Sequence, residues 1–330
     1  MTMEKIPVFF TFDKNYVVAA EVAIYSMLKH ASPAYEYKLY VLHTDIPRKA
    51  QKELTKLINR FRNTSLEFID TSAFDSAIKN FHNKSHFSKE IFYKLIASEI
   101  FPQYDRIICS DVDVVFTGDI SPSYFMYEHE KFYFAGVGQI IENNRMNTYG
   151  NQFTDAELQI LKKEIAAGYL LMNLKHIREN QMQQKLTGFY AANYHRLRLP
   201  EQDCIILCCY PDVRYLPMEY VVCNSYYKYE QEKSALIFYN DNDSIPKDPI
   251  IAEEMFTCAL RNPIQLHYVG ERKPWNSFPI PKQKLWYSVL RESGYTSHWI
   301  RALPRIILKK YSRYSLKRFI SKIKKRMTQR

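Results

Sequence analysis

Glycine is scarce in this sequence, with 8 residues among 330. Neither glycine-rich phosphate-binding pattern, G-x-x-x-x-G-K-[ST] or G-x-G-x-x-G, occurs, and the nearest approach, Gly136-Val137-Gly138, lacks the third glycine. These absences argue against a P-loop enzyme and against a dinucleotide-binding enzyme. The hydrophobic content of 46% is still enough for a sizeable core, in one large domain or one domain with an appendage.

Cysteine pairs of the C-x-x-C type and long apolar runs are also missing. The six cysteines include no C-x-x-C pair, so we expect reduced core thiols rather than a zinc site. No stretch reaches the ~20 apolar residues of a membrane-spanning helix. The apolar run from residue 6 to 12 is too short for a secretory signal. We therefore expect a cytoplasmic protein, peripheral on the cytoplasmic face of the inner membrane.

Positive charge is concentrated at the C-terminal end. Twelve of the 46 basic residues lie from Arg301 onward, and no acidic residue follows Glu292. The first 300 residues therefore hold 34 basic against 35 acidic residues and are almost neutral. The tail also carries an apolar stripe at helical spacing, formed by Leu316, Phe319, Ile320, Ile323 and Met327.

A basic amphipathic helix fits an anionic membrane surface, so we expect residues 301–330 to contact the membrane. Nucleic acid is the competing partner of basic tails. The apolar stripe makes it the less favoured one, because phosphate neutralisation requires no apolar face. The remaining alternative is a helix whose stripe packs on the body of the protein.

Strand-like and helix-like segments alternate along the chain, which predicts an α/β fold with a mostly parallel sheet covered by helices on both faces. We expect one domain over residues 1–275 and a helical extension over residues 276–330. The predicted helices span residues 15–31, 47–61 and 88–100, and the predicted strands span residues 6–12, 38–43, 66–69, 106–109, 132–137, 169–173 and 264–267.

The stretch SDVDVVF places Asp111 and Asp113 just after a predicted strand. Ligands of open α/β sheets lie beyond the carboxyl ends of the strands. Two carboxylates that point the same way repel each other unless a cation lies between them, and Mg²⁺ or Mn²⁺ accepts such oxygen ligands. Solvated loop acids are the alternative interpretation of this pattern.

Two further stretches end predicted strands. In FTFDKNY, Asp13 and Asn15 can hydrogen-bond a base or ribose, or Asp13 can cap the next helix. In QLHYVGERKPWN, His267 ends a strand, Gly270 allows close backbone approach, and Lys273 can neutralise a phosphate.

Together these stretches resemble glycosyltransferase family eight, whose members are retaining enzymes with a GT-A fold, and in particular the bacterial lipopolysaccharide α-galactosyl- and α-glucosyltransferases. The resemblance covers residues 6–276. It implies that Mn²⁺ is bound by Asp111, Asp113 and His267. It also implies that the nucleotide part of a UDP-sugar contacts Phe12, Asp13, Asn15, Asp111, Val112, Asp113, Gly270 and Lys273.

Other stretches resemble the family with substitutions. Lys94 in IFYKLIASEI stands where the family has arginine, and Glu201 in LPEQDCIIL stands where it has aspartate, beside the family's Gln202. The resemblance makes these three residues the catalytic candidates. Ala166 in IAAGYLLMNL replaces an asparagine that touches the donor sugar, and Gln139 lies near the usual place of an acidic residue. These departures bear on which sugar is transferred.

The resemblance implies retaining transfer of a hexose, galactose or glucose, from a UDP-sugar to a cell-surface glycan such as lipopolysaccharide core, with Mn²⁺ or Mg²⁺. Gln202 would stabilise the cationic sugar during front-face attack. Double displacement through Glu201 is the mechanistic alternative.

Two other classes of protein remain open. SDVDVVF also resembles the opening motif of haloacid-dehalogenase-like phosphatases, with Asp111 as nucleophile, although that motif normally follows the first strand of its domain. The other alternative is a non-catalytic nucleotide-sugar-binding protein, which the substitutions at Lys94 and Ala166 would suit.

Overall fold

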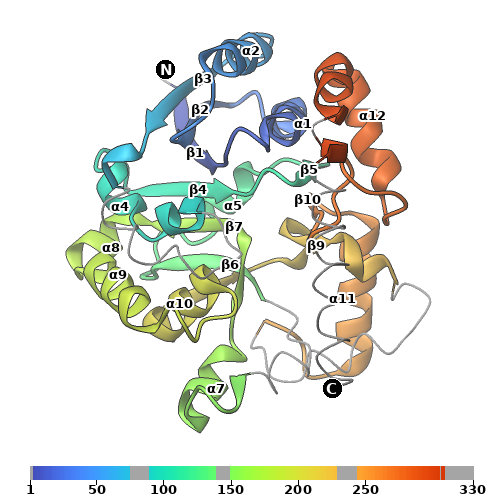
Figure 1. Cartoon of the computed structure of the whole chain (residues 1–330). Coiled ribbons are helices and arrows are strands. Elements are labelled where there is room, and N and C mark those ends of the chain that lie inside the picture. The colour runs from blue at the N-terminus through green and yellow to red at the C-terminus, as the bar shows by residue number, and fades with distance from the viewer. Residues whose placement is uncertain (1–2, 75–88, 139–148, 229–243, 305, 309–330) are drawn as a thin grey trace, which may run out of the picture.

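A computed structural model describes residues 3–74, 89–138, 149–228, 244–304 and 306–308 (Figure 1). Its centre is a seven-stranded sheet with the strand order β3-β2-β1-β4-β7-β6-β8, and a three-stranded sheet of order β5-β10-β9 adjoins it. The strands are β1 (Glu4–Thr11), β2 (Tyr35–His43), β3 (Thr64–Asp70), β4 (Arg106–Ser110), β5 (Val114–Phe116), β6 (Phe134–Gly138), β7 (Ile165–Asn173), β8 (Val213–Leu216), β9 (Val222–Cys223) and β10 (Gln265–His267).

The central sheet is mostly parallel, as predicted. β3, β2, β1 and β4 pair in parallel, and so do β6 and β8. β7 is the exception, because it pairs antiparallel with both β4 and β6. The sheet therefore has one reversed strand, and this strand lies directly beside β4, which leads into the two aspartates.

Helices cover both faces of the sheet because neighbouring strand residues are buried on opposite sides. In β1, Val8 and Phe10 belong to one core cluster and Phe9 to the other. The main helices are α1 (Val17–His30), α2 (Arg48–Ile58), α4 (Ala97–Ile100), α5 (Ser121–Phe125), α7 (Asp155–Leu161), α8 (Leu174–Glu179), α9 (Met182–Asn193), α10 (Pro200–Cys209), α11 (Pro249–Arg261) and α12 (Gln283–Ser293). Buried residues of α1, α2 and α12 pack in the first cluster, and those of α8, α9 and α10 pack in the second.

One predicted helix is wrong. In place of a single α-helix over residues 88–100, the described part has a 3₁₀ segment, η3 (Lys89–Lys94), followed by the short helix α4. Residues 92–97 are all buried, whereas a surface helix buries only one face. Tertiary contacts on every side have therefore overridden the helical propensity of this segment.

The described residues after 275 pack against the N-terminal part of the chain. α12 lies beside α1, where Trp286 is fully buried and Arg60 donates to the backbone oxygen of Ser293. The next helical residues, 296–304, place His298 Nδ1 2.6 Å from Glu21 Oε1 of α1. The predicted amphipathic stripe after residue 315 lies outside the described residues.

No helix among the described residues is both long enough and apolar enough to cross a membrane.

Candidate active site

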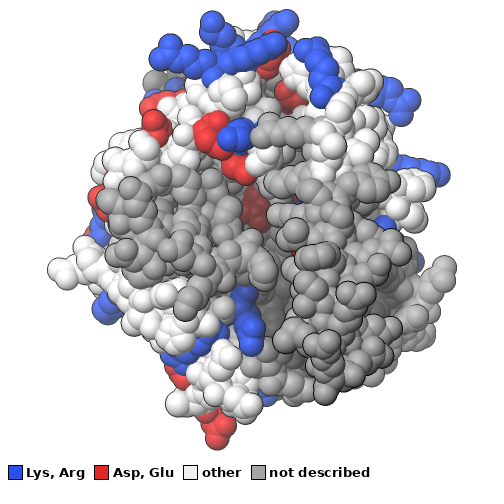
Figure 2. Space-filling view, in the orientation of Figure 1, with Lys and Arg blue, Asp and Glu red and all other residues white. Residues whose placement is uncertain are grey.

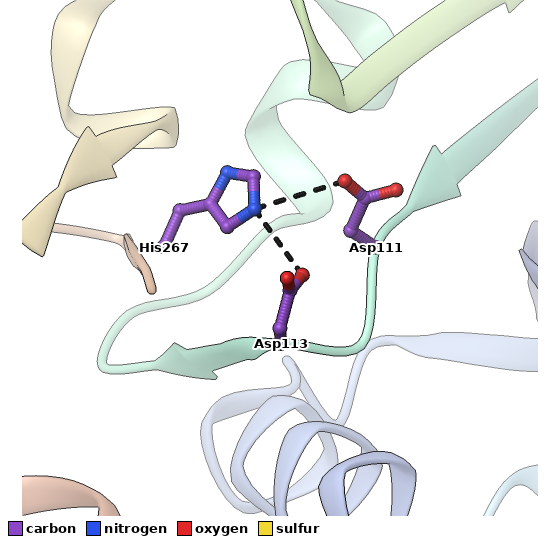
Figure 3. A group of neighbouring side chains, drawn as sticks. All are labelled: Asp111, Asp113 and His267. Atoms are coloured by element: carbon purple, nitrogen blue, oxygen red, sulfur yellow. Dashed lines mark ion pairs between the residues drawn. The ribbon is translucent and has the colours of Figure 1, made fainter. Parts of the chain in front are cut away.

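Asp111, Asp113 and His267 form the centre of the candidate site (Figure 3). Each offers one ligand atom, and these atoms all lie within 4.8 Å of one another. His267 Nε2 lies 3.2 Å from Asp113 Oδ1 and 3.7 Å from Asp111 Oδ2. The imidazole points into the space between the two carboxylates. The fold thus brings together the three residues that the resemblance gives as metal ligands.

Main-chain hydrogen bonds hold this cluster in place. Asp111 follows β4 directly, and its backbone N donates to Gly168 O on β7 at 3.0 Å. β5 begins one residue after Asp113 and pairs antiparallel with β10, so Val114 lies opposite His267. The Tyr268 N–H donates to Asp113 O at 2.9 Å. The two sheets therefore meet at the cluster and hold both sides of it.

Gly168 makes room for the cluster. A Cβ atom at this position would lie 2.6 Å from His267 Nδ1 and 3.6 Å from Asp111 Oδ2. The first distance is far below van der Waals contact, so the imidazole could not keep its place beside any larger residue. Gly168 is thus required by the position of His267, a role that the sequence pattern alone did not indicate.

Lys94 neutralises the charge of Asp111. Its ammonium donates to Asp111 Oδ1 at 2.7 Å and to Ala167 O at 2.9 Å, and it lies 4.0 Å from Glu201. Burial alone would lower the pKa of Lys94, but the charge of Asp111, together with the hydrogen bond to it and with Cys109 and Glu201, outweighs burial and raises the pKa above its ordinary value. Lys94 is therefore a buried cation and not an exposed lysine on a helix surface.

Lys273 takes the corresponding place beside Asp113. Its ammonium lies 2.5 Å from both Asp113 Oδ2 and the backbone oxygen of Tyr268. Burial alone would raise the pKa of Asp113, but Lys273 and His267 outweigh burial and hold the pKa well below its usual range. Asp113 is thus a carboxylate at neutral pH, in a site where each aspartate has one lysine partner.

The donor set fits a divalent cation. Two carboxylate oxygens from the β4–β5 connection and one imidazole nitrogen from the end of β10 converge, and Mn²⁺ and Mg²⁺ accept such ligands. Among the described residues this is the one group of three or more such side chains with converging ligand atoms. The two lysines already balance both carboxylates, so a cation at this place would free Lys94 or Lys273 to face a second anion.

The first turn of α10 borders the site. Gln202 Oε1 accepts a hydrogen bond from the Ala167 N–H at 3.3 Å, next to Ala166. Gln202 Nε2 and Glu201 Oε2 are buried and have no hydrogen-bond partner among the described residues. Burial raises the pKa of Glu201 above its ordinary value, although Lys94 opposes this shift. Unsatisfied buried polar atoms are costly, which is why such atoms often mark the place of a ligand.

Asp203, the residue after Gln202, has a different role. Asp203 is fully buried and accepts hydrogen bonds from the Tyr149 hydroxyl and from the backbone N–H groups of Arg198 and Leu199. It therefore ties the start of α10 to the preceding loop. Asp203 positions Glu201 and Gln202 without facing the cluster.

The end of β1 and the segment after β10 also meet. The Tyr16 ring packs edge-on against Trp275 at 5.6 Å, so the predicted uridine-binding and diphosphate-binding segments are neighbours in space. Asp13 accepts hydrogen bonds from the backbone N and side-chain Nδ2 of Asn15. Asp13 thus forms a local turn before α1. The N-cap residue of α1 is Tyr16 and no side chain caps the helix, so Asp13 is not its cap.

The remaining predicted nucleotide-binding residues differ in whether their side chains or only their backbone can reach a ligand. The Phe12 and Val112 side chains are buried in the core, so only their backbone can face a nucleotide. Gly270 has a φ of +80°, a left-handed conformation that favours glycine. Gln139 lies outside the described residues.

Gln265 is a buried polar residue of β10 that the sequence pattern did not single out. Its Nε2 donates to Ser110 Oγ at 2.9 Å, next to the two aspartates, and its Oε1 has no partner among the described residues. Its position two residues before His267 on the same strand was the available signal, because such residues share a face.

The face of the molecule shown in Figure 2 is hollowed in the middle. Figure 2 shows acidic atoms at the bottom of a hollow in the middle of the face, while Lys and Arg gather at the top of the view, over α2.

Comparison with known proteins defines the class. The family model described as "Glycosyl transferase family 8" matches residues 7–278, so the chain belongs to this family. This family match does not favour the phosphatase alternative. The predicted resemblance and the GT-A fold are thereby confirmed.

Particular relatives are distant. The chain is 23% identical to glycosyltransferase GlyE of Streptococcus pneumoniae serotype 4 over 91% of this chain and 64% of that protein. It is 22% identical to the lipopolysaccharide 1,2-glucosyltransferase of Escherichia coli K12 over 66% of this chain and 57% of that protein. The chain thus spans less than two thirds of the length of these two curated relatives.

A solved structure shows the same fold. The galactosyltransferase LgtC, in complex with donor and acceptor sugar analogues, aligns with a TM-score of 0.65 and 16% identity over 87% of this chain and 96% of that chain.

Proposed function

We propose that this protein is a retaining glycosyltransferase that moves a hexose from a UDP-sugar to a saccharide acceptor. The observation that carries the proposal is the cluster of Asp111, Asp113 and His267 at the strand ends, with a buried lysine beside each aspartate. The cluster has the ligand types for a divalent cation and the cations for a diphosphate. Family membership supports the same reaction class.

Asp111, Asp113 and His267 would hold the ion, which is Mn²⁺ or Mg²⁺ in this proposal. When bound, such an ion supplies Lewis-acid stabilisation of the negative charge on the departing diphosphate. Lys273 would turn from Asp113 toward a phosphate oxygen, since its flexible stem allows a short movement. Lys94 stays bound to Asp111 and Ala167 O, and it keeps the aspartate carboxylate aimed into the cluster.

Glu201 and Gln202 would bind the sugar ring. Gln202 Oε1 already accepts from Ala167 N, and its second lone pair is left for a cationic sugar carbon. We favour front-face attack, in which the leaving phosphate oxygen accepts the proton of the acceptor hydroxyl. An amide is a poor nucleophile, so a covalent intermediate would have to form on Glu201.

Galactose and glucose are the proposed donor sugars, and a cell-surface glycan such as lipopolysaccharide core is the proposed acceptor. The names of two relatives support this choice, since one is a lipopolysaccharide glucosyltransferase and one a galactosyltransferase. The basic tail, residues 301–330, would hold the enzyme on the cytoplasmic face of the inner membrane, next to a lipid-linked acceptor.

The test is a panel of nucleotide sugars incubated with the protein and Mn²⁺, with release of free UDP as the readout. We expect hydrolysis of UDP-galactose or UDP-glucose, lost on chelation. UDP binding without hydrolysis of any donor would instead establish the non-catalytic alternative. Turnover of p-nitrophenyl phosphate without a nucleotide sugar would establish the phosphatase alternative.

A further inference from the structure

The outward face of α2 is a basic surface that contributes no residue to the Asp111, Asp113 and His267 cluster. Arg48, Lys52 and Lys56 follow one another at intervals of four residues, so they lie in one row along the helix. Together with β3 this row lines a groove of about 460 Å³, whose walls are Arg48, Gln51, Lys52, Thr55, Lys56, Asn59 and Phe68. The Lys and Arg side chains at the top of Figure 2 lie over this helix.

The structure shows no stabilising role for these three cations between described residues. Between described residues, no ion pair involves Arg48, Lys52 or Lys56, and all three are exposed. The acidic residue of α2, Glu53, lies off this row and is half-buried. The opposite face of α2 packs through Leu54, Leu57 and Ile58. The helix thus has one apolar face in the core and one face of uncompensated positive charge.

The route to the C-terminal tail runs along the same part of the fold. The Tyr295 hydroxyl donates to Glu53 O of α2 at 3.0 Å, and Arg60 Nη1 donates to Ser293 O at 2.5 Å. His298 then contacts Glu21 on α1. The described chain that leads toward the basic tail is therefore fastened to α1 and α2.

We propose that the α2 basic face, Arg48, Lys52 and Lys56 with its groove, is a docking surface for the phosphate headgroups of an anionic membrane. A row of exposed cations on a convex helix complements a planar array of phosphates, and each such residue near the surface strengthens attachment. The groove is open and is lined by flexible lysine side chains, so it suits many headgroups rather than one enclosed ligand. This surface acts together with the tail and does not depend on the reaction at the cluster.

Nucleic acid fits this face less well. Single-stranded binding sites combine a basic groove with aromatic rings on which bases stack. The one aromatic residue here, Phe68, packs against the core and leaves no stacking platform. Anionic headgroups attract exposed cations without a stacking platform.

The test compares two full-length triple variants by co-sedimentation with vesicles of phosphatidylcholine and phosphatidylglycerol. Arg48→Gln, Lys52→Gln and Lys56→Gln neutralise the α2 basic face. Lys131→Gln, Lys175→Gln and Lys185→Gln remove the same charge from exposed positions elsewhere. We expect binding to weaken about tenfold to hundredfold in the first variant and by less than about twofold in the second.

An equal loss in both variants, or none in the first, would overturn the proposal, because binding would then follow total charge or the tail alone. Prevention of vesicle binding by millimolar inorganic phosphate at constant ionic strength would reassign the groove to a small anion. Loss of RNA binding with vesicle binding intact would reassign it to nucleic acid. Release of UDP from a donor sugar, measured on the same preparations, reports separately on the transferase and should be equal in all three proteins.

Discussion

The candidate site has two halves, one around Asp111 and Asp113 and one around Glu201 and Gln202. They differ in how many of their polar atoms have hydrogen-bond or ion-pair partners. Around Asp111 and Asp113, each carboxylate has a lysine partner, and the backbone of both is hydrogen-bonded to a neighbouring strand. Around Glu201 and Gln202, one polar atom of each side chain is buried without a described partner. The first half is thus prearranged for charge, and the second is incomplete without a polar ligand.

This contrast separates two tasks that the proposal assigns to the site. Changes in the first half should affect binding of the nucleotide and metal. Changes in the second half should affect the sugar and the rate of its transfer while leaving nucleotide binding in place.

Replacement of Asp113 should have the largest effect. Asp113→Ala removes one proposed metal ligand and leaves Lys273 without its carboxylate, so Mn²⁺-dependent release of UDP from the donor should fall about 1000-fold. The readout is the initial rate at saturating donor. Asp155→Ala, at an exposed position in the first turn of α7, is the matched control and should keep the wild-type rate. A comparable loss in the control would mean that the effect is not local.

Gln202→Ala tests the second half. We expect kcat to fall about 100-fold with little change in UDP affinity, because the amide would act on the sugar as charge develops. Steady-state kinetics and a UDP titration measure the two quantities. Gln184→Ala on the exposed face of α9 serves as control. If UDP affinity fell together with kcat, the proposed division of tasks would be wrong.

Gly168→Ala should disturb the first half through a single methyl group. The new Cβ would collide with His267 at 2.6 Å from Nδ1, so Mn²⁺-dependent UDP binding should weaken about 10- to 100-fold. Gly188→Ala introduces the same group on α9, where nothing lies within 4 Å, and should be neutral or slightly stabilising. Equal UDP affinities in the two variants would show that the imidazole is not needed where the structure places it.

Lys94→Met should affect stability as well as activity. It leaves Asp111 and the Ala167 carbonyl without their donor, so the free energy of unfolding should fall by about 1–3 kcal/mol. Urea unfolding measures this loss. Lys185→Met, at an exposed site, should stay within about 0.5 kcal/mol of wild type. A neutral result at Lys94 would show that the buried pair contributes nothing to folding.

The smallest effect concerns pH. The hydrogen bond to Glu21 raises the pKa of His298 above its usual 6.5, and burial raises that of Glu21 above its usual 4.5. The folded state therefore holds more protons than the unfolded state, so this contact loses stability as pH rises from about 6.5 upward. Urea unfolding between pH 6 and pH 9 should show a steeper decline for wild type than for His298→Gln. Parallel curves would contradict this assignment.

Sequence patterns could predict the parts of the site that lie at the ends of apolar strands. Asp111 and Asp113 follow one apolar strand and His267 ends another, so each position was visible in the sequence. Their grouping as one set of ligands came from the family resemblance. The patterns could not reveal that Gly168 borders His267, because that contact joins residues 99 positions apart on strands of different sheets.

The incorrect helix over residues 88–100 and the short strands that were not predicted have the same origin, which is contact with distant parts of the chain. The segment around Lys94 has helical spacing, but residues 92–97 are all buried, and the chain forms a 3₁₀ segment and a short helix there. β5, β8 and β9 contain two to four residues each, too few to show a period, and pairing with distant strands defines them. Local sequence carries the strand ends, whereas the close packing around them is a property of the whole fold.

The division of the site is tested most directly by calorimetric titration of UDP in the presence and absence of Mn²⁺, with wild type, Asp113→Asn and Gln202→Ala side by side. We predict that Mn²⁺ strengthens UDP binding in wild type and in Gln202→Ala but not in Asp113→Asn. Mn²⁺-dependent UDP binding of wild-type strength in Asp113→Asn would contradict the assignment of the cluster as the metal and diphosphate site.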